Sequence, residues 1–441
     1  MVDIETILEG SNGAPLTAKI KVIGVGGAGS NAVEYMYNAD VKNVDFIICN
    51  TDCQALMHNK VPNKIQLGKN LTKGLGAGSD PNAGLESAKE SLSQIEEMLE
   101  GADMVFVTAG MGGGTGTGAA PLIAKTAKDK DILTVGVVSI PYRFEGTERI
   151  AAAYDGIKRM SEAVDSIIVL NSERLREMYG NMELDQAMSM SDEVLAQAVR
   201  GVTEVVTTYA RYNVDFADLR TCMKDSGVSL IGVGQTSGDD KALKALHQAL
   251  SSPIINNHDI RGAKHVIVYF MTPPKESGYG LSVDEISDVS DKVRELTDIP
   301  NGENVKRLIW GSGFDESLKD EVRITVIVTG FQDDVFETVS HEPEVKVLEV
   351  NTEGNLVEEY LYKDESGSSF VIKEPENREA IDKMNMLYDK TDDLTMLESY
   401  DITELEEVKT LPIDELEKDN VLETIERTPA YIRWGKNQNR S

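Results

Sequence analysis

Apolar residues in the first 170 positions fall into short runs that alternate with segments of helical periodicity. The runs cover residues 18–23, 44–49, 102–108, 132–140 and 166–170. Runs of this length, bounded by turn residues, are typical of strands buried on both faces. The intervening segments predict helices at 84–100, 119–128 and 147–163. We therefore expect an α/β domain with a Rossmann-like parallel sheet and helices on both faces.

The second half of the chain has a different pattern. A long helix is predicted at 191–212, and its apolar residues cover more than one face. We therefore expect this helix to lie buried between two domains. The segments that follow predict strands at 228–234, 264–272, 305–312 and 321–330 and helices at 239–251 and 282–297. This mixture predicts an α+β C-terminal domain.

These patterns also predict the domain boundaries. The expected segments are a flexible leader at 1–17, the α/β domain at 18–190, the central helix at 191–212, the α+β domain at 213–331, an acidic and mostly disordered linker at 332–427 and a C-terminal peptide at 428–441. Short β-like runs at 345–372 are compatible with a small hairpin inside the linker.

Composition restricts the function. The 441 residues carry a formal net charge of −31, and the acidic excess is concentrated in the linker. Such a charge argues against nucleic-acid binding, which depends on basic side chains. The three cysteines show no disulfide or metal spacing, which favours a reducing environment and no protein-held metal. No apolar stretch suits a secretion signal or a membrane span, so we expect a cytoplasmic protein without direct membrane insertion.

Three glycine-rich loops supply the candidate chemistry. They are Gly24–Gly29, Gly74–Gly78 and Gly112–Gly118, the last of which contains only glycine and threonine. Glycine lets successive backbone N–H groups turn toward one point, and a helix N-terminus adds unpaired N–H groups and partial positive charge. We expect all three loops at the carboxyl edge of the parallel sheet, where ligands of such sheets bind. The loops therefore favour a polyphosphate ligand.

The first loop taken alone supports another class of protein. Gly24, Gly26 and Gly29 match G-x-G-x-x-G, and Asp52 follows after about 20 residues, as in NAD(P)-dependent oxidoreductases. Such an enzyme leaves the other two loops unexplained, and the chain has no Walker P-loop. A third class is a nucleotide-binding structural protein that assembles without hydrolysis.

The set of motifs resembles the tubulin/FtsZ family, and in particular its bacterial cell-division members. The run G-G-G-T-G-T-G at Gly112–Gly118 is similar to the tubulin signature. The further matching motifs, in the family's order and spacing, are Gly24–Asn31, Asn50-Thr51-Asp52, Gly74–Gly78, Phe144-Glu145-Gly146 with Arg149, and Asn213–Asp218. The resemblance covers residues 18–331 and the terminal peptide. It implies a GTPase that polymerises head to tail into filaments of the division ring.

The resemblance also implies the GTP and GDP contacts. The residues implied are Gly26, Gly27, Ala28, Gly29, Ser30 and Asn31 for the diphosphate and sugar, Ala77 and Gly78 for the terminal phosphate, Gly114, Thr115, Gly116 and Thr117 for the phosphate cradle, Glu145 and Arg149 for the ribose region, and Asn171 and Asp192 for guanine. A carboxylate suits guanine because it accepts from N1–H and from the exocyclic amine. Where the family often has an aromatic residue near the base, this chain has Ala187-Met188.

Several of these residues also have simpler interpretations. Glu145 and Arg149 are four positions apart and suit a surface ion pair on a helix. Asp192 follows a serine and suits a helix cap, and Asn171 suits a turn at a strand end. As a set in the family's order, however, the residues favour the nucleotide site.

The expected catalytic residues are Asn213, Asp215 and Asp218. The resemblance implies that this loop faces the nucleotide of a neighbouring subunit, so that hydrolysis requires assembly. The two carboxylates would order and polarise the attacking water, while Mg²⁺ bound with the nucleotide stabilises charge on the phosphates. The simpler interpretation is that Asp215 and Asp218 cap the next helix.

The terminal peptide resembles the family's partner-docking tail. Tyr431, Ile432 and Trp434 are expected to be apolar anchors, and Arg433 a charged contact. The implied partner is a membrane-tethering division protein, which would hold the filaments beneath the membrane at mid-cell. The simpler interpretation is a tail without a partner.

Overall fold

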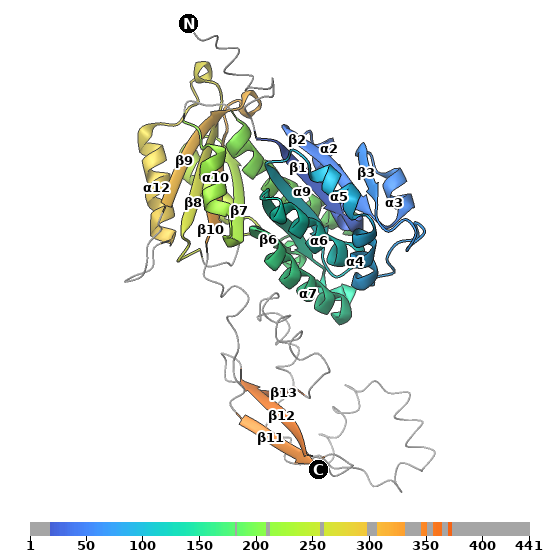
Figure 1. Ribbon diagram of the computed structural model, residues 1–441. Helices are drawn as coiled ribbons and strands as arrows, with labels where there is room; N and C mark the ends of the chain where they lie inside the picture. Colours follow the sequence, from blue (N-terminus) through green and yellow to red (C-terminus); the bar gives the residue numbers. More distant parts are fainter. Residues whose placement is uncertain are drawn as a thin grey trace, which may run out of the picture. The chain divides into compact units, whose positions relative to one another are not determined.

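The computed structural model describes residues 18–180, 183–208, 212–255, 260–297 and 307–330, and three strands between 345 and 372. Contacts divide the chain into two units. The first contains the two folded domains up to residue 330, and the described part of the second is the three-stranded sheet (Figure 1).

The N-terminal half of the first unit is built on six parallel strands. They are β1 (Ile20–Val25), β2 (Val44–Asn50), β3 (Asn63–Gln66), β4 (Met104–Gly110), β5 (Leu133–Ile140) and β6 (Ser166–Asn171), in the spatial order β3-β2-β1-β4-β5-β6. The runs that predicted strands at 18–23, 44–49, 102–108, 132–140 and 166–170 are thereby confirmed.

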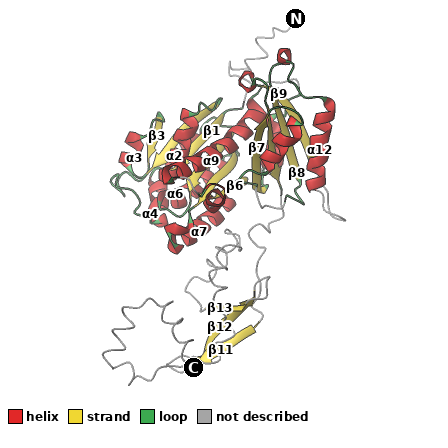
Figure 2. Cartoon of the chain, turned by 180° about the vertical axis from the view of Figure 1, so that it is seen from behind, coloured by secondary structure: helices red, strands yellow, loops and turns green. Residues whose placement is uncertain are grey.

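Helices cover both faces of this sheet (Figure 2). They are α2 (Gly26–Asn38), α3 (Cys53–His58), α4 (Pro81–Glu90), α5 (Leu92–Leu99), α6 (Thr115–Asp129), α7 (Thr147–Ala163) and α8 (Ser172–Tyr179). Alternate residues of β4 belong to different cores: Met104 and Phe106 to one, Val105 and Val107 to the other. All four side chains are fully buried, which explains why the strand reads as a continuous apolar run.

Two predicted helices differ from those observed. The helix expected at 119–128 begins at Thr115, so Pro121 lies inside it and not in its first turn. Close packing holds the glycine-rich start in helical form: a Cβ atom on Gly118 would lie 2.0 Å from the carbonyl oxygen of Pro81. The helix expected at 84–100 is divided into α4 and α5 at Ser91.

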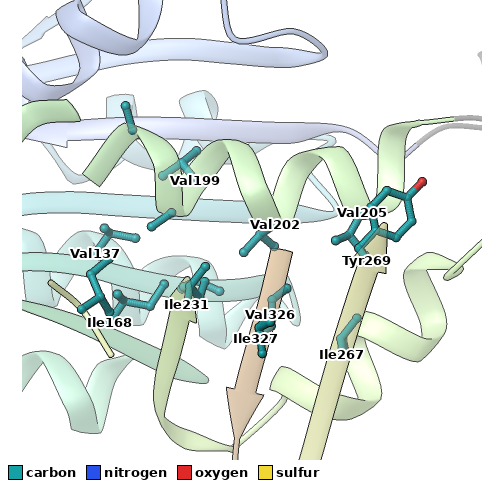
Figure 3. Close-up of a cluster of buried hydrophobic side chains, with 14 of the residues drawn as sticks. Val137, Ile168, Val199, Val202, Val205, Ile231, Ile267, Tyr269, Val326 and Ile327 are labelled. Carbon is teal, nitrogen blue, oxygen red and sulfur yellow. The ribbon is translucent and has the colours of Figure 1, made fainter. Parts of the chain in front are cut away.

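The central helix α9 (Leu184–Thr207) contacts both halves of the first unit. It begins and ends earlier than the predicted 191–212. Val199, Val202 and Val205 are buried along it, and Figure 3 shows them with Val137 of β5 and Val326 of the C-terminal domain. These residues belong to one hydrophobic core, as expected for a helix between two domains.

The C-terminal domain continues the same sheet. Its elements are α10 (Phe216–Met223), β7 (Gly227–Thr236), α11 (Lys241–Leu250), β8 (His265–Thr272), α12 (Val283–Thr297), β9 (Arg307–Phe314) and β10 (Val322–Thr329), with short 3₁₀ turns between them. The strand order from β6 onward is β7-β10-β8-β9. The β7–β10 and β10–β8 pairs are antiparallel, so the predicted α+β pattern is confirmed.

The second unit contains a small antiparallel sheet inside the segment expected to be mostly disordered. Its strands are β11 (Val345–Val350), β12 (Leu356–Lys363) and β13 (Ser369–Ile372), with β12 in the centre. The sequence suggested at most a hairpin here, because the strands are short and the surrounding composition is acidic. Across the described part of the chain, no helix has the length and hydropathy to cross a membrane.

Candidate functional site

The three glycine loops meet at the carboxyl edge of the parallel sheet. Gly26 follows β1 with φ of +74°, and a Cβ atom there would lie 2.9 Å from the backbone nitrogen of Gly116. A Cβ atom on Gly114 would lie 2.8 Å from the Cβ atom of Ala77 and 2.9 Å from the nitrogen of Asp80. One site is therefore enclosed by the first turns of α2 and α6 and by the 74–80 loop. Their backbones approach one another so closely that only glycine fits at the contacts.

The first loop has an open side and a packed side. A Cβ atom on Gly27 would meet no other atom within 4 Å, and Ala28 and Asn31 are both exposed. In contrast, a Cβ atom on Gly29 would lie 2.3 Å from the carbonyl oxygen of Thr108. The hydroxyl of Ser30 is buried and has no hydrogen-bond partner among the described residues. The open side and this unsatisfied hydroxyl fit a polar ligand at the start of α2.

The two threonines of the third loop hold its shape. The Thr117 hydroxyl accepts a 2.9 Å hydrogen bond from the backbone N–H of Gly112 and is fully buried. The Thr115 hydroxyl lies 2.7 Å from that of Thr51, which follows β2. The Thr117 side chain therefore stabilises the loop from its buried side. A Cβ atom on Gly113, in contrast, would meet no other atom within 4 Å.

Glu145 and Arg149 form an ion pair beside the third loop. The Nη1 atom of Arg149 lies 2.9 Å from Oε2 of Glu145, and Glu145 also accepts from the backbone N–H of Tyr142. A Cβ atom on Gly112 would lie 2.5 Å from the carbonyl oxygen of Arg149, so the pair lies against the phosphate loop. The ion pair expected from their spacing is thus present, and it lies beside the third loop.

The expected guanine residues come from β6 and α9. Asn171 ends β6, and its side-chain oxygen accepts a 3.0 Å hydrogen bond from the Glu173 N–H at the start of α8. Asp192 is not a helix cap, because α9 begins at Leu184. Burial raises the pKa of Asp192 to about 7. Burial raises the pKa of Tyr35 on α2, and the Asp192 carboxylate adds a smaller effect in the same direction, so Asp192 lies near that helix.

The expected catalytic loop lies at the opposite edge of the sheet. Asp215 caps α10, where its carboxylate accepts a 2.7 Å hydrogen bond from the N–H of Asp218. Arg220 and Lys224 pair with Asp131 at 2.8 and 2.9 Å and lower its pKa. Asp131 precedes β5, so α10 lies at the amino edge of strands whose carboxyl ends carry the glycine loops.

One chain therefore does not bring its two sets of residues together. The eight residues of β5 span roughly 25 Å at about 3.3 Å per residue. Asn213 and Asp215 are exposed, and Asp218 is half-buried, so the loop is accessible from outside. Capping by Asp215 fixes the loop at the start of α10, and the polar loop residues stay accessible to solvent.

Other expected features are placed as follows. Tyr431, Ile432, Arg433 and Trp434 lie outside the described residues. Within the described ranges, no group of three or more His, Cys, Asp or Glu side chains could hold a metal ion.

Sequence reasoning missed two supporting residues. Thr51, which is fully buried against Thr115, had no signal beyond the N-T-D motif. Asp80 caps α4 by accepting from the N–H of Asn82, and the Asp80-Pro81 pair is a recognisable helix start.

Known proteins of similar sequence define the class. A family model described as the GTPase domain of the tubulin/FtsZ family matches residues 19–180, and one described as the C-terminal domain of the FtsZ family matches 227–332. The cell division protein FtsZ of Porphyromonas gingivalis is 38% identical over 419 residues, which cover 94% of this chain and 85% of that protein. That of Aquifex aeolicus is 42% identical over 332 residues, covering 75% and 88%.

Solved structures agree with this match. The empty FtsZ dimer of M. jannaschii has a TM-score of 0.64 at 39% identity, covering 71% of this chain and 88% of that one. GDP-bound CetZ1 of Haloferax volcanii has a TM-score of 0.62 at 20% identity, covering 71% and 95%, which shows the fold alone.

The fold and the converging glycine loops define a guanine-nucleotide-binding GTPase of the tubulin type. Within that class, the chain belongs to the FtsZ family. It is a cytoskeletal GTPase of cell division, and the resemblance found in its sequence motifs is confirmed.

Proposed function

We propose that this chain polymerises head to tail and hydrolyses GTP at the junction between two subunits. The observation that carries the proposal is the separation of the glycine loops from the Asp215–Asp218 loop at opposite edges of one sheet. Head-to-tail stacking of identical subunits places the amino edge of one against the carboxyl edge of the next. The FtsZ dimer of M. jannaschii is in keeping with such assembly.

The phosphates would bind between the first turns of α2 and α6. Backbone N–H groups of Gly26–Ser30 and Gly114–Thr117 would donate to them, supported by the positive ends of two helix dipoles. Ala77 and Gly78 would complete the cradle beside the terminal phosphate. The close approach of Gly114 to Ala77 supports this assignment.

The sugar and base would lie toward β6 and α9. Glu145 and Arg149 would exchange their mutual ion pair for contacts with the ribose region, with Asn31 nearby on α2. Asn171 and ionised Asp192 would read the guanine edge. No aromatic residue stands at 187–188, where Met188 is 40% exposed and offers an apolar surface instead.

In the assembled site, the next subunit would supply Asn213, Asp215 and Asp218. The carboxylates would orient and polarise the attacking water, and one of them would accept its proton, while the backbone N–H groups stabilise the negative charge on the phosphates. Mg²⁺ suits phosphate oxygens and water better than a protein cage. It would neutralise phosphate charge when it enters with GTP.

The terminal peptide would serve attachment. Its apolar anchors and Arg433 suit docking on a membrane-tethering division protein, which would hold the filament beneath the membrane at mid-cell. Removal of 428–441 would then leave polymerisation intact and abolish recruitment to tether-coated membranes.

Turnover as a function of protein concentration tests the proposal. Phosphate release per subunit should be negligible at low concentration and rise above a threshold at which light scattering by polymers also appears. A rate per subunit that does not change on dilution would contradict it. Polymers that form with GTP but release no phosphate would instead support the non-hydrolysing structural protein, and binding of NAD would support the oxidoreductase.

A further inference from the structure

The acidic loop, residues 213–218, leads into the short helix α10, which makes two different kinds of contact. Its fully buried residues, which belong to the hydrophobic core, are Leu219, Cys222 and Met223. Arg220 and Lys224 are one helical turn apart and both contact Asp131, in the turn between α6 and β5. Apolar packing and a charged contact therefore hold α10 together.

The charged contact uses the whole of Asp131. The Nη2 atom of Arg220 lies 2.8 Å from Oδ2 of Asp131 and donates a 2.9 Å hydrogen bond to its backbone carbonyl oxygen. The Nζ atom of Lys224 lies 2.9 Å from Oδ1 of the same carboxylate. Because each carboxylate oxygen meets a different residue of α10, the contact opposes both sliding and rotation of the helix.

The backbone of Asp131 is fixed independently of α10. Its N–H donates a 2.9 Å hydrogen bond to the carbonyl oxygen of Lys128 in the last turn of α6, and its φ of +58° turns the chain toward β5. Ala127 before it and Ile132 after it are buried. Asp131 therefore gives α10 of the C-terminal domain a fixed point of attachment on the α/β domain.

This contact is better suited to positioning than to stabilising the fold. The side chain of Asp131 is 74% exposed, and exposed ion pairs contribute little to the free energy of unfolding because water screens them. Arg220, however, is only two residues from Asp218 on the same short helix. A small movement of α10 therefore moves Asp218, and catalysis is sensitive to small displacements of the reacting groups.

We propose that Asp131 is a positioning residue for GTP hydrolysis, because it sets the place of α10 and thereby of Asp218. The inference rests on the proposed function, in which the acidic loop acts on the nucleotide of the next subunit. Asp131 lies at the opposite edge of the sheet from the glycine loops of its own chain. Its loss therefore affects turnover at formed junctions and leaves GTP binding unchanged.

Asp131→Gly removes the carboxylate and suits the backbone, because glycine adopts a positive φ without strain. Phosphate release per polymerised subunit should fall about three- to tenfold. The Kd for GTP, measured in dilute protein, should stay within about twofold, and the melting temperature within about 2 °C. Asp131→Asn, which keeps the shape of the side chain and loses its charge, should give the same loss of turnover.

Asp225→Asn is the matched control. Asp225 also has a positive φ, of +49°, and an exposed carboxylate that pairs with Lys128 at 2.9 Å. It follows α10, however, where the N–H groups of Ser226 and Gly227 already bond the carbonyl oxygen of Asp165. Turnover by this variant should match that of the unmodified protein.

Amide hydrogen exchange measures the position of α10 without hydrolysis. In dilute protein with GDP, the amides of 216–223 should exchange at least about threefold faster in Asp131→Gly than in the unmodified protein. Exchange in α12, which is remote from Asp131 in the sequence, should not change. Equal exchange of α10 in the two proteins would overturn the proposal.

The remaining outcomes distinguish this inference from the proposed function. If Asp218→Asn abolishes turnover but Asp131→Gly does not lower it, Asp131 has no positioning role. A fall in GTP affinity or in melting temperature that accompanies the loss of turnover would show a structural role and would also overturn the proposal. Full turnover by Asp218→Asn would instead contradict the proposed function, and the positioning role with it.

Discussion

Asp192 is a half-buried carboxyl whose proposed contact with guanine carries a cost in stability. Its pKa of about 7 lies well above the ordinary value because burial disfavours its charge. The proposed contact with guanine needs the ionised form, which accepts two hydrogen bonds. The carboxyl group is therefore ready to ionise when the base arrives.

This residue gives a pH-dependent prediction. Because the folded pKa is raised, the neutral carboxyl favours folding at low pH, and that contribution is lost as the pH rises through about 7. Asp192→Asn should therefore raise the thermal stability of the nucleotide-free protein at pH 8 more than at pH 5. It should also weaken GTP binding at pH 8, as titration calorimetry would detect. Lower stability of the variant at pH 8 would contradict the assignment.

The second residue-level prediction concerns the acidic loop. Asp218→Asn preserves the size of the side chain and should leave GTP binding unchanged while lowering phosphate release by ~100-fold or more. Asp225→Asn is the matched control, because Asp225 lies just beyond α10 and pairs with Lys128. Both proteins should polymerise. Full turnover by the Asp218 variant would remove this residue from the mechanism.

At the scale of elements, two glycines in the first turn of α2 have different roles, one in packing and one in nucleotide binding. Gly29→Ala places a methyl group against a backbone carbonyl of β4 and should cost about 1–3 kcal/mol of unfolding free energy. Gly27→Ala meets open space and should leave stability within about 0.5 kcal/mol while weakening GTP binding tenfold or more. Chemical denaturation and nucleotide titration distinguish the two. Equal destabilisation by both substitutions would contradict this division.

The ion pair between α9 and β10 gives another prediction at this scale. Arg323 lies 3.0 Å from Glu204 and 3.4 Å from Asp315 and is 12% exposed. Arg323→Met leaves the partly buried Glu204 without this cation and should cost about 2–4 kcal/mol of unfolding free energy. Adding Glu204→Gln should recover part of that loss, since the remaining charge is removed. A double variant less stable than Arg323→Met alone would show that the pair is not the cause.

Elements differed in how far their sequence determined them. Buried parallel strands such as β4 were predicted because both faces are covered and the run is continuous. The start of α6 was missed because glycine and an internal proline oppose a helix, and only close packing against α4 and β4 overrides that preference. Thr117 stays a predicted ligand contact through its backbone N–H, while its hydroxyl accepts a hydrogen bond from the Gly112 N–H inside the loop, a role that depends on the folded geometry.

At the scale of the whole molecule, the proposed GTPase site is divided between two edges of one sheet. Sequence motifs located both halves, and the family resemblance implied that they meet across two subunits. The position of α10 within one chain required the structure, in which ion pairs hold it beside Asp131. The distance is too great for one chain to close. In the proposed mechanism, assembly and hydrolysis are therefore linked, because the glycine loops of an isolated subunit lie at the opposite edge of the sheet from its own acidic loop.

Mixing two inactive variants tests this link most directly. Asp218→Asn keeps the glycine loops, while Gly27→Leu, which fills the open side of the first loop, keeps the acidic loop. An equal mixture should restore roughly a quarter of the junctions found in the unmodified protein, because one pairing in four joins an intact nucleotide loop to an intact acidic loop. Phosphate release well above the sum of the separate variants is the predicted result. A mixture no more active than that sum would contradict a site completed by the neighbouring subunit.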